Sequence, residues 1–115
     1  MAPYTKALKK GLNDLQAATM WLMQNAMAKP DNAGAASTVF MHLFGLVSLG
    51  YMWAMMAKSA QEKLAGGADG QASFYENKLV TGRYFMERVM PETAAHLARI
   101  STGSDTMMAL PADAF

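Results

Sequence analysis

The pattern of apolar and polar positions divides the chain into three long stretches with helical spacing. In the first, about residues 4–28, apolar side chains recur every three or four residues, as one face of a helix requires. The positions of this stripe are Tyr4, Leu8, Leu12, Leu15, Thr19, Leu22 and Ala26. Polar residues, among them Lys10 and Asp14 one turn apart, occupy the opposite side. We therefore predict an amphipathic helix that ends near Pro30, because proline disfavours helical geometry at the residue before it.

The second stretch, about residues 33–65, is dominated by nineteen consecutive residues without a charge, Val39 to Ala57. A run of roughly 18 or more such residues is long enough to span a membrane. A helix that is apolar on all sides can equally lie at the centre of a soluble bundle. Asp31 or Asn32 is expected to cap its start, and the pair Gly66-Gly67 to stop it.

The third stretch, about residues 74–102, has a narrow apolar seam, typical of a helix that packs at a shallow angle against its neighbours. The seam consists of Tyr75, Leu79, Gly82, Met86, Val89, Thr93, Leu97 and Ile100. A capping box is expected at Ser73. Pro91 must disturb the helix, but the seam continues in phase across it, which favours a kink over two separate helices.

These stretches predict an all-α fold: an antiparallel bundle of three long helices, the third kinked at Pro91, plus a short C-terminal turn at about residues 104–109. The chain, residues 1–115, has the length of a single domain. Leu110 and Phe115 are expected to pin the tail to the bundle. The amphipathic first and third helices need an apolar partner in water, and the uncharged run is their natural partner. We therefore expect the uncharged run to be surrounded by protein and not by lipid.

Composition narrows the classes of function. Ten basic and nine acidic residues leave a net charge of +1, which gives no electrostatic reason to expect nucleic acid or an anionic membrane surface as a partner. The absence of cysteine excludes disulfides and thiolate chemistry and fits a cytoplasmic protein. The twelve methionines are interpreted as flexible fillers of an irregular core, their commoner role.

Residues that could carry chemistry are few. His42 lies inside the apolar run, where a packing role is commoner than a ligand role. His96 follows Glu92 by one turn, a spacing that can hold a metal, but no second Glu-x-x-His motif completes a di-iron bundle site. No glycine-rich phosphate loop or nucleophile elbow occurs. From the residues alone we predict no catalytic, cofactor-binding or metal-binding residue, and interpret the chain as a helical interaction module.

Two stretches, read in order, resemble a known family. The first is Leu43 to Ala57 (LFGLVSLGYMWAMMA); the second joins Phe74–Leu79 (FYENKL), Arg83–Ala94 (RYFMERVMPETA) and Met108–Leu110 (MAL). Their order is similar to the extra C-terminal domain of a branch of bacterial flavin-dependent acyl-CoA dehydrogenases. That branch includes enzymes similar to 3-methylmercaptopropionyl-CoA dehydrogenase. The resemblance covers nearly the whole chain.

The resemblance implies a non-catalytic accessory domain. In that family the flavin, the acyl-CoA pocket and the catalytic glutamate belong to upstream domains, so no catalytic residue carries over and FAD is implied only for the parent enzyme. The parent reaction would be α,β-dehydrogenation of an acyl-CoA, in bacterial fatty acid metabolism in the cytoplasm. The implied partners are the catalytic domains, and a homodimer is also open. The candidate interface residues on the second helix are His42, Phe44, Tyr51, Trp53 and Met56.

Two other interpretations stay open. One is a free-standing helical adaptor with an exposed Met/Trp surface, and the other is a small single-span membrane protein that uses residues 39–57. Because the chain starts just ahead of the domain's first helix, the sequence leaves open whether it is an excised part of an enzyme or stands alone.

Overall fold

Helices make up nearly all of the computed structural model, which describes residues 1–115 and contains no strand. The elements in chain order are α1 (Ala2–Asn25), α2 (Asp31–Ala65), the 3-10 turn η1 (Ala68–Gly70), α3 (Ala72–Tyr84), the π-helical turn η2 (Phe85–Val89), α4 (Glu92–Ser101) and the 3-10 turn η3 (Ala112–Ala114). The all-α class and the three long helical segments are thus confirmed.

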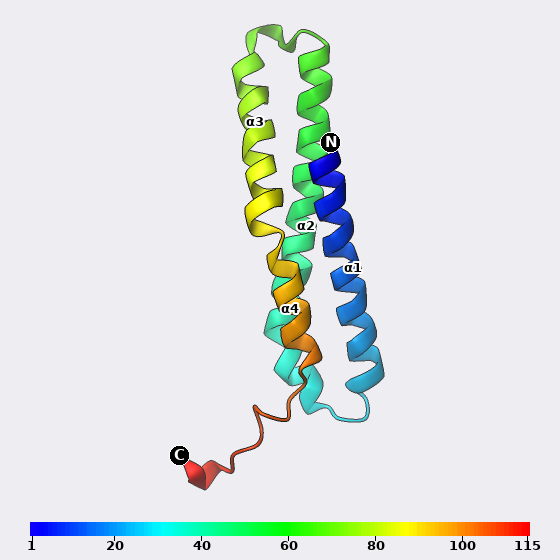
Figure 1. The fold of residues 1–115 in the computed structure, drawn as a ribbon, viewed down its shortest axis with the longest axis vertical. Helices are drawn as coiled ribbons and strands as arrows, with labels where there is room; N and C mark the ends of the chain where they lie inside the picture. The colour runs from blue at the N-terminus through cyan, green and yellow to red at the C-terminus, as the bar shows by residue number, and fades with distance from the viewer.

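The central element of the bundle is α2, which packs against α1, α3 and α4. Figure 1 shows α3 and α4 following each other along one side of α2, with α1 along the other side. Because α1 begins part-way along α2, the end of the molecule near η1 is a two-helix hairpin. The molecule is consequently long and thin, with extents of 66 × 29 × 16 Å. Such a shape leaves a small core: 18 of the 115 residues are buried.

The break between α3 and α4 is a π turn followed by Pro91. The N–H of Met90 donates to the carbonyl of Phe85, five residues earlier, at 3.0 Å, and Pro91 has no N–H to continue the ladder. The kink predicted at Pro91 is therefore confirmed, with a π turn as its local form. The extra residue of this turn directs the Met90 side chain, 2% exposed, into the middle of the bundle.

Met90 fills the space that two glycines leave open. A Cβ added to Gly11 of α1 would lie 2.7 Å from Cε of Met90, and one added to Gly50 of α2 would lie 2.8 Å from its Sδ. The three segments approach closely at this point because two of them carry no side chain there. Two small apolar clusters lie on either side, one with Tyr4, Leu46, Ala57 and Met86, the other with Ala18, Ala36, Leu43, Val47 and Ile100.

The buried line of α1 differs from the predicted stripe. Leu12 is 43% exposed and Thr19 is exposed, whereas Gly11, Asp14 and Ala18 are buried. The prediction was wrong at these positions because it followed the largest apolar side chains, while the closest helix contacts are made by the smallest residues. In contrast, every position of the seam from Tyr75 to Ile100 is buried or half-buried, as predicted.

Asp14, placed on the polar side by its sequence position, is 5% exposed and lies between α1 and α4. The ammonium of Lys10 donates to both of its carboxylate oxygens at 2.6 and 2.7 Å, and the hydroxyl of Thr93 donates to Oδ2 at 2.8 Å. A buried carboxylate is tolerated when it is paired and hydrogen-bonded in this way. The network links α1 to α4 just after Pro91.

The predicted helix caps are wrong. The α2 helix follows Pro30 without a side-chain cap from Asp31 or Asn32, and α3 begins at Ala72 without the capping box expected at Ser73. The stop after α2 is confirmed, since Gly67 has φ +98°.

The side chain of Asn32 instead joins the loop after α1 to the end of α4. Its amide donates to the carbonyl of Asn25 at 3.2 Å, and its Oδ1 accepts from the backbone N–H and the hydroxyl of Ser104 at 3.0 and 2.9 Å. Beyond this point the tail leaves the bundle (Figure 1). Leu110 is 63% and Phe115 is 95% exposed, so the expectation that they pin the tail is wrong.

Gly82 supplies a first test of this packing. A Cβ there would lie 2.8 Å from Oη of Tyr4 and 3.1 Å from Cε3 of Trp53, and both aromatic rings are stiff. Tyr4 is further fixed because its hydroxyl donates to the carbonyl of Leu79 at 2.5 Å, and burial raises the pKa of that hydroxyl above its usual value. We expect Gly82→Ala to lower the free energy of unfolding in urea by about 1–3 kcal/mol through overpacking.

The matched control is Gly45→Ala on α2, where a Cβ meets nothing within 4 Å. There the substitution is expected to raise the free energy of unfolding by about 0.5–1 kcal/mol, because alanine loses less backbone entropy than glycine in a helix. Equal effects of the two substitutions would contradict the packing described around Gly82.

Candidate functional site

The side of α2 that faces away from the bundle is apolar and exposed. Its large side chains have exposed fractions between 39% for Met56 and 63% for Met41. We call this set the α2 outer face: Met41, Phe44, Leu49, Tyr51, Met52, Met55 and Met56. It lies within the uncharged run, so no charged side chain interrupts it. Scattered exposed apolar residues are normal in soluble proteins, whereas larger exposed apolar surfaces are typical of contact surfaces for protein or membrane.

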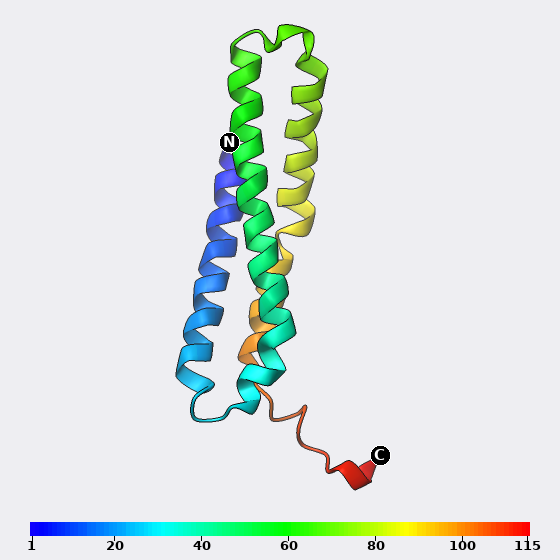
Figure 2. The same cartoon turned by 180° about the vertical axis from the view of Figure 1, so that it is seen from behind.

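The outer face exists because α2 is apolar around its whole circumference while the bundle covers one side of it. Leu43, Leu46, Val47 and Gly50 turn inward at helical spacing, whereas Phe44, Ser48 and Leu49 turn outward. Figure 2 shows α2 nearest the viewer, with α1 and α3 beside it and α4 behind it, so no other element of the chain lies over this side. The α2 helix is long and apolar enough, by length and composition, to cross a membrane, and 17% of its most apolar window is buried.

Methionine is the characteristic residue of this surface. Met86 and Met90 are buried, whereas the other ten methionines are exposed, four of them on the α2 outer face and two on α1. The interpretation of methionine as mainly a core filler is therefore wrong for this chain. Flexible, polarizable methionine side chains can adapt to more than one opposing surface, which suits a face that becomes covered.

The five candidate interface residues do not lie together. Phe44, Tyr51 and Met56 belong to the α2 outer face. His42 is exposed at its edge and stacks on His96 of α4, with 6.4 Å between ring centroids. Trp53 is half-buried and turned toward α3.

Trp53 belongs to the packing between α2 and α3. Its ring lies 6.2 Å from that of Phe85, and the ammonium of Lys78 is 6.0 Å from its centroid. A tryptophan in an apolar run can face either way, and only the position of α3 decides it. Four members of the outer face were missed by the sequence prediction: Met41, Leu49, Met52 and Met55. The spacing of three and four residues outward from Phe44 could have found three of them.

His96 lies close to one acidic side chain, that of Glu92. Nε2 of His96 lies 3.8 Å from Glu92, and its Nδ1 is buried without a hydrogen-bond partner. No three side chains of the histidine, cysteine, aspartate or glutamate types come together as metal ligands. The pairing of His96 with Glu92 one turn earlier was predicted as structural, and its geometry is that of a weak, partly exposed pair.

The chain is thus a thin helical bundle with one uncovered apolar helix face. The model of the family described as "Acetyl-CoA dehydrogenase C-terminal like" matches residues 1–111. The chain belongs to this family.

A curated relative agrees with that membership. Over 87 residues, 76% of this chain, the sequence is 31% identical to 3-methylmercaptopropionyl-CoA dehydrogenase of Ruegeria pomeroyi (strain ATCC 700808 / DSM 15171 / DSS-3). The aligned segment spans 14% of that protein, so this chain corresponds to a small part of its relative. The family resemblance inferred from the ordered motifs is confirmed.

The α2 outer face can be tested for a structural role inside the chain. Because Phe44 and Met52 are more than half exposed and belong to neither core cluster, Phe44→Gln with Met52→Gln should change the free energy of unfolding by no more than about 0.5 kcal/mol per site, as for ordinary surface substitutions. Leu43→Ala, at a fully buried neighbour, should cost about 2–5 kcal/mol. Urea unfolding measures both, and binding of a hydrophobic dye should fall in the double variant. A large loss of stability in the double variant would show that the face is packed within the chain.

Proposed function

We propose that this chain is a non-catalytic accessory domain of a FAD-dependent acyl-CoA dehydrogenase and that it packs on the catalytic domains through the α2 outer face. The proposal rests on two observations taken together: the chain belongs to this family, and the α2 outer face is uncovered. The parent enzyme would carry out α,β-dehydrogenation of an acyl-CoA thioester in the bacterial cytoplasm, as part of fatty acid metabolism. FAD, the acyl-CoA pocket and the catalytic base would all belong to its other domains.

The small share of the relative that this chain matches supports the assignment of the catalytic parts to other domains. The aligned segment is 14% of a protein named as a dehydrogenase, so most of the relative lies outside the segment. A domain joined to a catalytic body by the same polypeptide meets it at a high effective concentration. A modest apolar face is then sufficient for stable packing.

The size of the face argues for the catalytic domains over a homodimer as the partner. The nineteen uncharged residues of α2 span roughly 28 Å at 1.5 Å per residue, and a helix about 12 Å wide then offers roughly 340 Å². A stable complex between separate proteins buries about 800 Å² on each partner. The α2 outer face alone falls short of that area, which fits a contact within one polypeptide better than a dimer of free copies.

The packing of α2 also favours a protein partner over lipid. To cross a membrane alone, α2 would have to release Met90 from Gly50 and lose its contacts with α1, α3 and α4. The apolar faces of those helices would then be exposed to water. A protein partner covers the outer face and leaves the bundle intact.

Methionine oxidation tests the docking face without any substitution. Two samples are compared: the chain alone, and a chimera of the Ruegeria pomeroyi relative in which this chain replaces the aligned segment. In both, the oxidation of each methionine by dilute peroxide is followed by mass spectrometry. We expect Met41, Met52 and Met55 to be oxidised in the free chain and about tenfold more slowly in the chimera, because docking removes them from solvent. Met23 and Met27, 69% and 90% exposed on the α1 side of the bundle, are the internal control and should react equally in both.

Several outcomes would contradict the proposal. Unchanged oxidation of the α2 methionines in a folded chimera would show that another face docks. Protection that appears in the free chain as its concentration rises would indicate a homodimer. Flavin that co-purifies with the free chain and supports acyl-CoA oxidation would show that the chain is not merely an accessory domain.

A further inference from the structure

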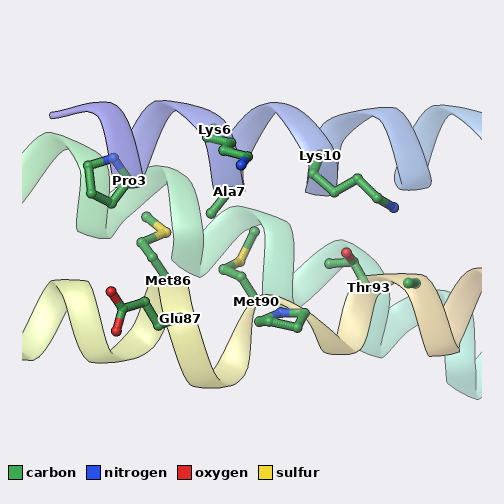
Figure 3. Close-up of a pocket in the computed structure, with 10 residues that line it drawn as sticks. Pro3, Lys6, Ala7, Lys10, Met86, Glu87, Met90 and Thr93 are labelled. Carbon is green, nitrogen blue, oxygen red and sulfur yellow. The ribbon is translucent and has the colours of Figure 1, made fainter.

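A groove of about 500 Å³ runs between α1 and the π turn, on a different side of the bundle from the α2 outer face. Its apolar part is formed by Ala7, Met86, Met90, Pro91 and Ala94. Figure 3 shows Met86 and Met90 rising from the π turn toward α1, and Lys6 on the opposite wall. The volume lies within the range of about 300–1,000 Å³ usual for small-molecule sites, as does the mainly apolar lining with a few polar groups.

The groove is held open by contacts at both of its ends. Beside Lys10, the hydrogen bond from Thr93 to Asp14, 2.8 Å long, fixes α4 to α1. Beside Pro3, the hydroxyl of Tyr4 binds the carbonyl of Leu79 and fixes α1 to α3. Between these two contacts, the π turn and Pro91 carry the chain out of regular helical packing. The space therefore follows from the backbone path and the two cross-links.

The charges around the groove leave one positive group uncompensated. The ammonium of Lys10 is bound by Asp14, and the carboxylate of Glu87 is bound by Nε of Arg83 at 2.7 Å. Lys6 makes no ion pair. A ligand in the groove would thus meet an apolar floor with a single free cation on its rim.

We propose that this groove binds an amphipathic monoanion, a carboxylate with an unbranched alkyl chain. The carboxylate lies at the ammonium of Lys6, and the alkyl chain lies along the apolar lining formed by Ala7, Ala94 and the edges of Met86 and Met90. Charge complementarity selects this ligand class: a cation would be repelled by Lys6, and a dianion would find only one free positive group. The ligand's apolar chain supplies most of the binding, and Lys6 supplies its orientation and the preference for an anion.

Titration of the isotope-labelled chain with sodium octanoate, followed by NMR, tests the site. We expect saturable shifts in the methyl groups of Met86 and Met90 and in the backbone of Ala7 and Ala94. Octanol should bind about two- to fivefold more weakly, the value of one solvent-exposed ion pair, and octylammonium should bind more weakly still. Shifts confined to the α2 outer face, equal shifts from all three probes, or no shifts would each overturn the proposal.

Variants separate the groove from non-specific attraction. Lys6→Gln should weaken octanoate binding about two- to fivefold, whereas Lys9→Gln, on an exposed lysine outside the groove, should leave it unchanged. Ala94→Phe should abolish binding, because the ring fills the groove from an exposed position; unfolding in urea shows whether that variant remains folded. Equal weakening by Lys6→Gln and Lys9→Gln would overturn the assignment of Lys6. Unchanged binding to folded Ala94→Phe would overturn the site.

Discussion

The insertion of Met90 between Gly11 and Gly50 is the contact on which the geometry of this bundle depends. It is made possible by the π turn, which adds one residue before Pro91 and directs that side chain to the point where α1, α2 and the third segment meet. Close approach at this one point draws the helices together in the middle, and the displaced backbone leaves the groove beside it. The same local irregularity therefore determines how tightly the bundle packs and where it is hollow.

Close packing on one side of α2 has a consequence on its other side. Of the seven buried residues of α2, four are small (Ala36, Gly50, Ala57 and Ala60) and three are larger (Leu43, Leu46 and Val47), whereas Phe44, Tyr51 and Met52 point outward. An isolated soluble helix would place its large apolar residues inward, because burial of apolar area is the main source of stability. The outward position of Phe44, Tyr51 and Met52 is consistent with large side chains that gain their burial only when another surface covers them. The fold of the chain and its proposed docking face are thus two results of one distribution of side-chain size.

Periodicity predicted the three helical segments, the seam of the third and its kink, because these depend on local spacing and on the missing N–H of Pro91. Properties that depend on which other segment of the chain packs against a residue could not be predicted from periodicity. Leu12 and Gly11 are adjacent, and only the path of α2 and the third segment shows that the glycine is the contact. Asp14 became buried because Thr93, 79 residues away, donates to it. The sequence allows Trp53 to face outward or inward, and only the position of α3 decides which, so the α2 outer face was predicted only in part.

The methionine content follows from the same distribution. The two buried methionines lie where the packing is irregular: Met90 fills the space at Gly11 and Gly50, and Met86 and Met90 both line the groove. On the outer face, methionine does what leucine does less well: its unbranched side chain can lie along α2 in the free chain and extend into an irregular opposing surface. Its apolar area still contributes about 25 cal/mol per Å² once it is covered. For the proposed docking role, an unbranched side chain such as methionine fits an irregular opposing surface better than a branched one does.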